Sequence, residues 1–148
     1  MFSKIVVGFD GSQMSDRALR LACDLAQKYE SELHLVHTPQ PRTVAFAMGA
    51  VAGYHTVTTM PSAAEIKEGN AKMLAAGKAI ATEHGQTIAQ THVKSGEPGD
   101  VIVQYADKVG ADLIVSGRHG HGVFSAMVQG STSLRINHIA KCATLSVI

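Results

Sequence analysis

Two kinds of hydrophobic pattern alternate along the chain. Short strand-like segments are followed by longer stretches in which apolar residues recur every three or four positions, as on one face of a helix. The first two strand segments, residues 4–9 and 33–37, are apolar almost throughout, which is typical of strands covered on both faces and therefore of a parallel sheet. Further strands are predicted at residues 87–94, at residues 112–116 and at the end of the chain.

Helices are predicted in the intervals between these strands. The first begins at Ser12, whose hydroxyl can cap it, and a long apolar face follows. The second begins at Ser62 and ends at Gly85, and its apolar face includes Gly69 and Gly77. Glycine in a helix interior is less favourable than alanine by about 1 kcal/mol, so these two glycines are expected to weaken the helix.

Two more helices complete the alternation. One follows the turn at residues 96–100 and ends at Gly110, and the last surrounds Ile136. The alternation predicts a single α/β domain spanning residues 1–148, with an open parallel sheet, right-handed crossovers and helices on both faces. Residues 39–60 fit neither period, and a connection of this length is either a functional lid or a disordered segment.

Composition and charge narrow the class of protein. With 148 residues, of which 45% are hydrophobic and 17% charged, the chain has a globular composition. A net charge of +1 without a basic cluster argues against nucleic acid as a partner. Because no apolar run approaches the roughly 20 residues of a membrane span or resembles a signal peptide, we expect a cytoplasmic protein without a membrane partner. Cys23 and Cys142 are expected to be free thiols.

The stretch at residues 117–133 carries the strongest indication of chemistry. Glycines that permit unusual backbone conformations are followed by consecutive hydroxyl residues at the predicted start of the last helix. Free amide groups, hydroxyls and the positive end of a helix dipole attract anions, most often phosphate. The residues concerned are Gly117, Gly120, Gly122, Gly130, Ser131, Thr132 and Ser133.

A second segment is expected to meet this stretch. Asp10 follows the first strand and Gly117 follows the fourth, and ligands of open α/β sheets bind outside the C-terminal ends of strands, where the strand order reverses. If these strands are neighbours, the glycine stretch holds phosphates while Asp10 faces a ribose hydroxyl or a phosphate-bound Mg²⁺. Phe9 and Thr38, also at strand ends, are expected to line a pocket for a base.

Two common nucleotide-binding motifs are absent from the sequence. The only Gly-Lys pair is followed by alanine, which excludes a Walker A loop, and no G-x-G-x-x-G follows the first strand. His119 and His121 lack the further ligands of a metal site, and Arg118 together with His119 is expected to meet phosphate instead. Because residues 117–133 contain no Asp or Glu, we expect binding with slow or absent hydrolysis and assign no catalytic residue.

The spacing of the glycine stretch resembles a known nucleotide-binding signature. Gly117, Gly120, Gly130 and Ser131 reproduce the pattern G-x2-G-x9-G-[ST] of the ATP-binding branch of the universal stress proteins. The similarity extends over essentially the whole chain, with further matches at residues 5–12, 35–37 and 112–117.

This resemblance implies a fold and a site. The fold is a five-stranded parallel sheet of order 3-2-1-4-5, with ATP in the cleft above the first and fourth strands. The implied phosphate contacts are Gly120, Gly130, Ser131 and Ser133, with Gly117 near the ribose and phosphates. Asp10 then lies near the ribose and adenine, and Thr38 borders the base. A homodimer is implied through the last strand, from Leu145 to Ile148.

The expected function is nucleotide binding in a regulatory or stress-response module. ATP with Mg²⁺ is the expected ligand, and AMP or cyclic AMP would suit the same cleft. Two alternatives remain open from the sequence. One is an adenylating or ATP-pyrophosphatase enzyme, because such enzymes share a related α/β architecture with a loop after the first strand. The other is a nucleotide-free dimeric interaction protein.

Overall fold

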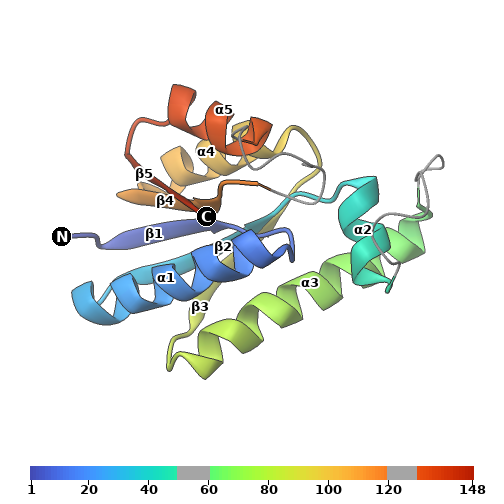
Figure 1. Ribbon diagram of the computed structural model, residues 1–148, viewed down its shortest axis with the longest axis horizontal. Coiled ribbons are helices and arrows are strands. Elements are labelled where there is room, and N and C mark those ends of the chain that lie inside the picture. The colour runs from blue at the N-terminus through green and yellow to red at the C-terminus, as the bar shows by residue number, and fades with distance from the viewer. Residues whose placement is uncertain (50–60, 120–129) are drawn as a thin grey trace.

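Five parallel strands form one sheet in the computed structural model, which describes residues 1–49, 61–119 and 130–148 (Figure 1). Across these residues the strand order is β3-β2-β1-β4-β5, which confirms the predicted sheet. The strands are β1 (Lys4–Gly8), β2 (Glu32–His37), β3 (Ile88–Val93), β4 (Leu113–Gly117) and β5 (Ala143–Val147).

Helices cover both faces of this sheet. The helices are α1 (Gln13–Tyr29), α2 (Pro41–Ala47), α3 (Ala63–Glu83), α4 (Pro98–Val109) and α5 (Ser131–Ile139). Figure 1 shows α1 and α3 on one side of the sheet and α4 and α5 on the other. The four long connections between parallel strands therefore divide between the two faces, as the predicted α/β architecture requires.

The core consists of one apolar layer on each side of β1. Ile5 and Val7 belong to the layer shared with α1, whereas Val6 belongs to the layer shared with α4. All three side chains are completely buried. A strand whose alternate residues face two buried layers must be apolar throughout, which explains why β1 shows no alternation of apolar and polar residues.

The two glycines of α3 are positions of close approach. A Cβ atom on Gly77 would lie 2.5 Å from Cδ2 of Leu35 on β2, and one on Gly69 would lie 3.3 Å from Cγ1 of Val44 on α2. Both glycines are buried. Glycine is unfavourable in a helix, but at these two positions it allows α3 to pack tightly against the sheet and against α2.

Helix α2 lies in the segment where the sequence shows no clear period. Its 7 residues are too few to display a helical repeat. The side chain of Thr43 stabilises its start, because its Oγ1 accepts a hydrogen bond from the Gln40 amide at 2.8 Å and donates one to the Gln40 carbonyl at 2.9 Å. Part of the segment is thus helical, and residues 50–60 lie outside the described residues.

Both cysteines are free thiols, and burial raises the pKa of Cys23 to about 11.

In the described parts of the chain, no helix is long and apolar enough to cross a membrane.

The packing of α1 can be tested with two leucines that lie on helices in opposite environments. Leu19 on α1 is completely buried, whereas Leu134 on α5 is 57% exposed. We expect Leu19→Ala to lower the free energy of unfolding by about 2–5 kcal/mol, since it removes buried methyl groups and leaves a cavity. Leu134→Ala should stay within about 0.5 kcal/mol of the parent protein. Equal losses in urea titrations of the two variants would contradict this assignment of the buried face.

Candidate functional site

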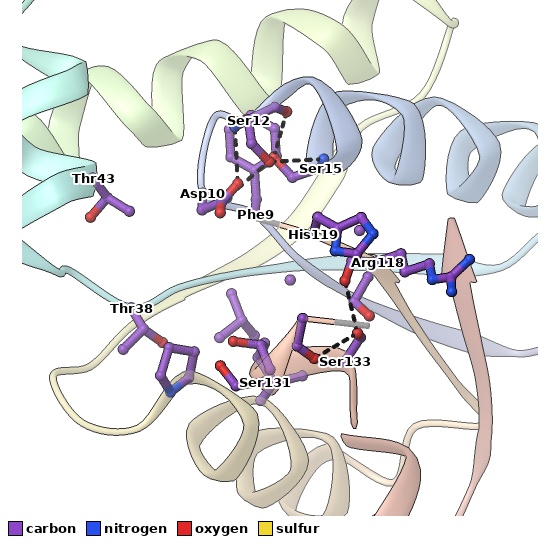
Figure 2. Close-up of a pocket in the computed structure, with 18 of the residues that line it drawn as sticks. Phe9, Asp10, Ser12, Ser15, Thr38, Thr43, Arg118, His119, Ser131 and Ser133 are labelled. Atoms are coloured by element: carbon purple, nitrogen blue, oxygen red, sulfur yellow. Dashed lines mark hydrogen bonds between the residues drawn. The ribbon is translucent and has the colours of Figure 1, made fainter. Parts of the chain in front are cut away.

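A cavity of about 310 Å³ lies at the C-terminal ends of β1, β2 and β4 (Figure 2). Strand β1 has β2 on one side and β4 on the other, so the strand order reverses at this point of the sheet. Gly120 and Gly122 lie outside the described residues, and every other predicted site residue lines the cavity. These residues are Phe9, Asp10, Thr38, Gly117, Arg118, His119, Gly130, Ser131, Thr132 and Ser133.

Hydrogen bonds between the two ends of the glycine stretch form one rim of this cavity. The Gly130 amide donates to the Arg118 carbonyl at 2.8 Å, and the Ser133 hydroxyl lies 3.0 Å from that carbonyl and 3.1 Å from the carbonyl of Gly130. A Cβ atom on Gly130 would lie 2.7 Å from the Arg118 carbonyl oxygen, so this closure requires glycine. Ser133 is fully buried, and its hydroxyl hydrogen is used inside the protein.

Helix α5 begins on this rim without the capping found in the longer helices. Side chains of Ser12, Ser62 and Glu97 cap α1, α3 and α4, and each of these helices has an acidic residue in its first turn. Among the described helices of nine or more residues, only α5 has neither a side-chain cap nor an acidic residue there. Its positive end therefore lies open beside the hydroxyls of Ser131 and Thr132, which favours an anion.

Gly117 allows the end of β4 to lie against the start of α1. A Cβ atom at Gly117 would lie 2.8 Å from Cβ of Met14, 2.9 Å from its backbone carbonyl carbon and 3.0 Å from the Ser15 nitrogen. Because two of these atoms belong to the backbone, a larger residue would displace α1. Gly117 thus brings the two rims of the cavity together.

The opposite rim is the turn between β1 and α1. The Asp10 carboxylate accepts a hydrogen bond from the Ser12 amide at 2.9 Å, and the Ser12 hydroxyl accepts one from the Ser15 amide at 3.3 Å. The Ser15 hydroxyl donates to the Ser12 carbonyl at 3.0 Å. Asp10 is half-buried, and it both orders this turn and places negative charge at the edge of the cavity.

Apolar side chains line the cavity together with hydroxyl and amide groups. Its apolar lining comes from Phe9, Val36, Pro98 and Ile102. The side-chain Nε2 of Gln40 donates to the Gly96 carbonyl at 3.0 Å and so joins the segment after β2 to the turn before α4. Thr38 is 7% exposed, and within the described residues its buried Oγ1 has no hydrogen-bond partner.

Several lining residues were not singled out as ligand contacts from the sequence. They are Gly8, Ser12, Ser15, Val36, Gln40, Thr43, Pro98, Ile102 and Ser116. Gln40 and Thr43 were missed because α2 was not predicted. The others lie at or next to the C-terminal end of a strand or the start of α1 or α4, and this position in an open α/β sheet is the signal that would have identified them.

Arg118 and His119 line the cavity in different ways. Figure 2 shows the guanidinium of Arg118 pointing away from Ser131 and Thr38. The Nδ1 atom of His119 is buried, without a partner in the described parts of the chain. In residues 1–49, 61–119 and 130–148, no group of three or more His, Cys, Asp or Glu residues is placed to hold a metal ion.

A buried histidine supports the rim that carries Asp10. The Nδ1–H of His37 donates to the Phe9 carbonyl at 2.9 Å, and the side chain is 1% exposed. Burial lowers the pKa of His37, although the Phe9 carbonyl and the charge of Asp10 act in the opposite direction. Burial therefore favours the neutral form of the imidazole.

Comparisons with known proteins agree with this fold. A model of the universal stress protein family matches residues 1–147. The universal stress protein YxiE of Bacillus subtilis is 32% identical over 150 residues, which cover 99% of each chain.

Two solved structures share the fold of this chain. A universal stress protein crystallised in complex with cAMP is 25% identical, with a TM-score of 0.71 over 99% of this chain and 97% of that one. A universal stress protein from Archaeoglobus fulgidus, in complex with dAMP, shares the fold with a TM-score of 0.69 at 23% identity, over 99% of this chain and 98% of that one.

Stability should depend on pH through His37. The lowered pKa means that the unfolded chain binds a proton more readily than the folded one, so the free energy of unfolding should fall as the pH falls from about 7 to about 5. The pKa of His92 is also lowered by burial and acts in the same direction. His37→Gln should therefore reduce this slope without abolishing it. A pH profile of the variant that runs parallel to that of the parent protein would contradict a buried, neutral His37.

Proposed function

Because the chain belongs to the universal stress protein family, we propose that its cavity binds an adenine nucleotide. The observation that carries this proposal is the uncapped start of α5, which opens onto a cavity that apolar side chains also line. Phosphate suits a helix N-terminus with neighbouring hydroxyls, and a base suits apolar walls with few polar groups. The complexes of similar proteins with cAMP and dAMP support this choice of ligand.

The proposed orientation follows the order of the strands. The phosphates lie at Gly130, Ser131 and Thr132, the ribose lies above β1 near Asp10, and the base lies above β2. The hydroxyl of Ser133 is bonded inside the protein, so we assign it the role of holding the rim rather than that of a direct phosphate ligand.

ATP is the proposed ligand, and AMP and cyclic AMP fit the same orientation. With ATP, a bound Mg²⁺ would be held mainly by phosphate oxygens, because Asp10 is the only carboxylate among the described residues that line the cavity. Gly120, implied by the glycine signature as a further phosphate contact, lies outside the described residues.

The proposed role is a regulatory module in which binding matters more than turnover. Phosphoryl transfer needs a group that positions water or accepts a proton beside the phosphates. Asp10 accepts a hydrogen bond from the Ser12 amide, and α5 supplies no carboxylate in its first turn. The Ser12 side chain caps α1, so the turn after β1 does not favour the alternative of an adenylating enzyme.

A homodimer through β5 is part of this proposal. In the described sheet, β5 is an edge strand whose last four residues are only half-buried, and Ile148 beyond it is 67% exposed. An edge strand of this kind can pair with a second copy of itself.

Phosphate binding at α5 can be tested with two variants of nearly equal size. Ser131 is exposed, so we expect both Ser131→Asp and Ser131→Asn to fold. An aspartate at this position interacts favourably with the helix dipole but repels phosphate. Ser131→Asp should therefore weaken binding of ATP and AMP by about tenfold or more, whereas the affinities of Ser131→Asn should stay within about threefold of those of the parent protein. Calorimetric titration measures both. Absence of binding by the parent protein at about 1 mM ATP, AMP and cyclic AMP would contradict the proposed function.

The dimer can be tested by sedimentation equilibrium. We expect the parent protein to have twice the mass of one chain, and Ile148→Lys to shift the equilibrium towards the monomer because it places charge beside the paired edges. Leu134→Lys, at an exposed position of α5, serves as the control and should remain dimeric. A monomeric parent protein, or equal effects of the two lysines, would contradict an interface at β5.

A further inference from the structure

We propose that the hydroxyl of Thr38 recognises the polar edge of the base and so makes the cavity selective for a base with an exocyclic polar group. This inference rests on the proposed function of the cavity. It adds a specificity-determining side chain to a site whose other contacts are mainly to phosphate and ribose.

The first observation is an unused hydroxyl in a buried position. Thr38 is 7% exposed, and in the described parts of the chain its Oγ1 has no hydrogen-bond partner. Buried polar groups normally have a partner, because burial deprives them of their hydrogen bonds to water. Since none of the described residues bonds this Oγ1, rotation about χ1 can turn the hydroxyl towards a bound molecule without breaking a hydrogen bond to them.

A second threonine at the same end of the cavity provides the contrast. Thr43 is 5% exposed and also lines the cavity, but its hydroxyl accepts from the Gln40 amide and donates to the Gln40 carbonyl. Its hydrogen-bonding capacity is used in starting α2. Of these two buried threonines, only Thr38 therefore has a hydroxyl available for a ligand.

The position of Thr38 selects the base as its partner. Neighbouring strands lie about 4.8 Å apart, so the ends of β2 and β4, with β1 between them, are separated by roughly 10 Å. The start of α5 lies on the side of β4, where the Gly130 amide is bonded to the Arg118 carbonyl. Figure 2 shows Thr38 well separated from Arg118, His119 and Ser133. A nucleotide with its phosphates at α5 therefore extends its base towards Thr38.

The surroundings of Thr38 suit the edge of a planar base. Val36 precedes Thr38 by two residues and lines the same cavity, and the hydrogen bond between the Gln40 side chain and the Gly96 carbonyl joins the segment after Thr38 to the turn before α4. A hydroxyl can accept a hydrogen bond, so Thr38 can pair with the exocyclic amino group of adenine. A base that lacks the exocyclic group leaves the hydroxyl unpaired.

The test compares Thr38→Val, which replaces the hydroxyl by a methyl group of similar shape, with two matched variants. Thr43→Val removes a hydroxyl that the protein uses, and Thr91→Val changes an exposed threonine of β3. Melting temperatures are measured without nucleotide. Dissociation constants are measured for AMP and for purine riboside 5′-monophosphate, which lacks the amino group of adenine.

We expect Thr38→Val to leave the melting temperature unchanged or to raise it, whereas Thr43→Val lowers it by about 2–4 °C. Thr38→Val should weaken AMP binding about tenfold and change binding of purine riboside 5′-monophosphate by less than about twofold. Thr91→Val should match the parent protein in every measurement.

Three results would overturn the proposal. These are a fall of several degrees in the melting temperature of nucleotide-free Thr38→Val, an equal loss of affinity for both nucleotides, and unchanged affinity for AMP. If the parent protein binds neither nucleotide, the proposed function on which this inference rests is rejected. The titration of the parent protein alone distinguishes this outcome from failure of the inference about Thr38.

Discussion

The site depends on the parallel pairing of β1 with both β2 and β4. Val7 lies opposite Leu35 in one pair and opposite Val115 in the other, so three strands end at the same edge of the sheet. Segments that are far apart in sequence thereby meet above β1 (Figure 2). The buried apolar layers on both sides of β1 hold this register, since a shift by one residue would exchange the two faces.

Two rims with opposite electrostatic character then face one cavity. The turn after β1 has its amides and hydroxyls engaged around Asp10 and Ser12, and it carries negative charge. The start of α5 has a positive dipole end without a capping side chain, and the bond between Gly130 and Arg118 fixes its position. A rim whose geometry is set by internal hydrogen bonds binds an anion with little further ordering, which is the physical basis of the proposed nucleotide site.

The sequence predicted the helices and strands that have strong patterns, but only part of the packing between them. The apolar runs and the caps at Ser12 and Ser62 identified their elements correctly, whereas α2 is too short to display a period. Strand order came from resemblance to a family, because pairing between distant strands leaves no local pattern. Gly77 and Gly117 illustrate the same limit, since the atoms they approach belong to segments remote in sequence.

The predicted site residues in the described parts of the chain all line the cavity. The internal hydrogen bonds of Ser133 and the unused hydroxyl of Thr38 could not be predicted, because they depend on three-dimensional contacts.

Amide chemical-shift mapping by nuclear magnetic resonance during a titration with AMP tests the central claim most directly. If one nucleotide bridges both rims, the largest changes fall at residues 9–12 and 131–133 together, with the same dependence on concentration, while β3 and the C-terminal half of α3 remain unchanged. Changes confined to one rim, or centred elsewhere on the molecule, would contradict the account.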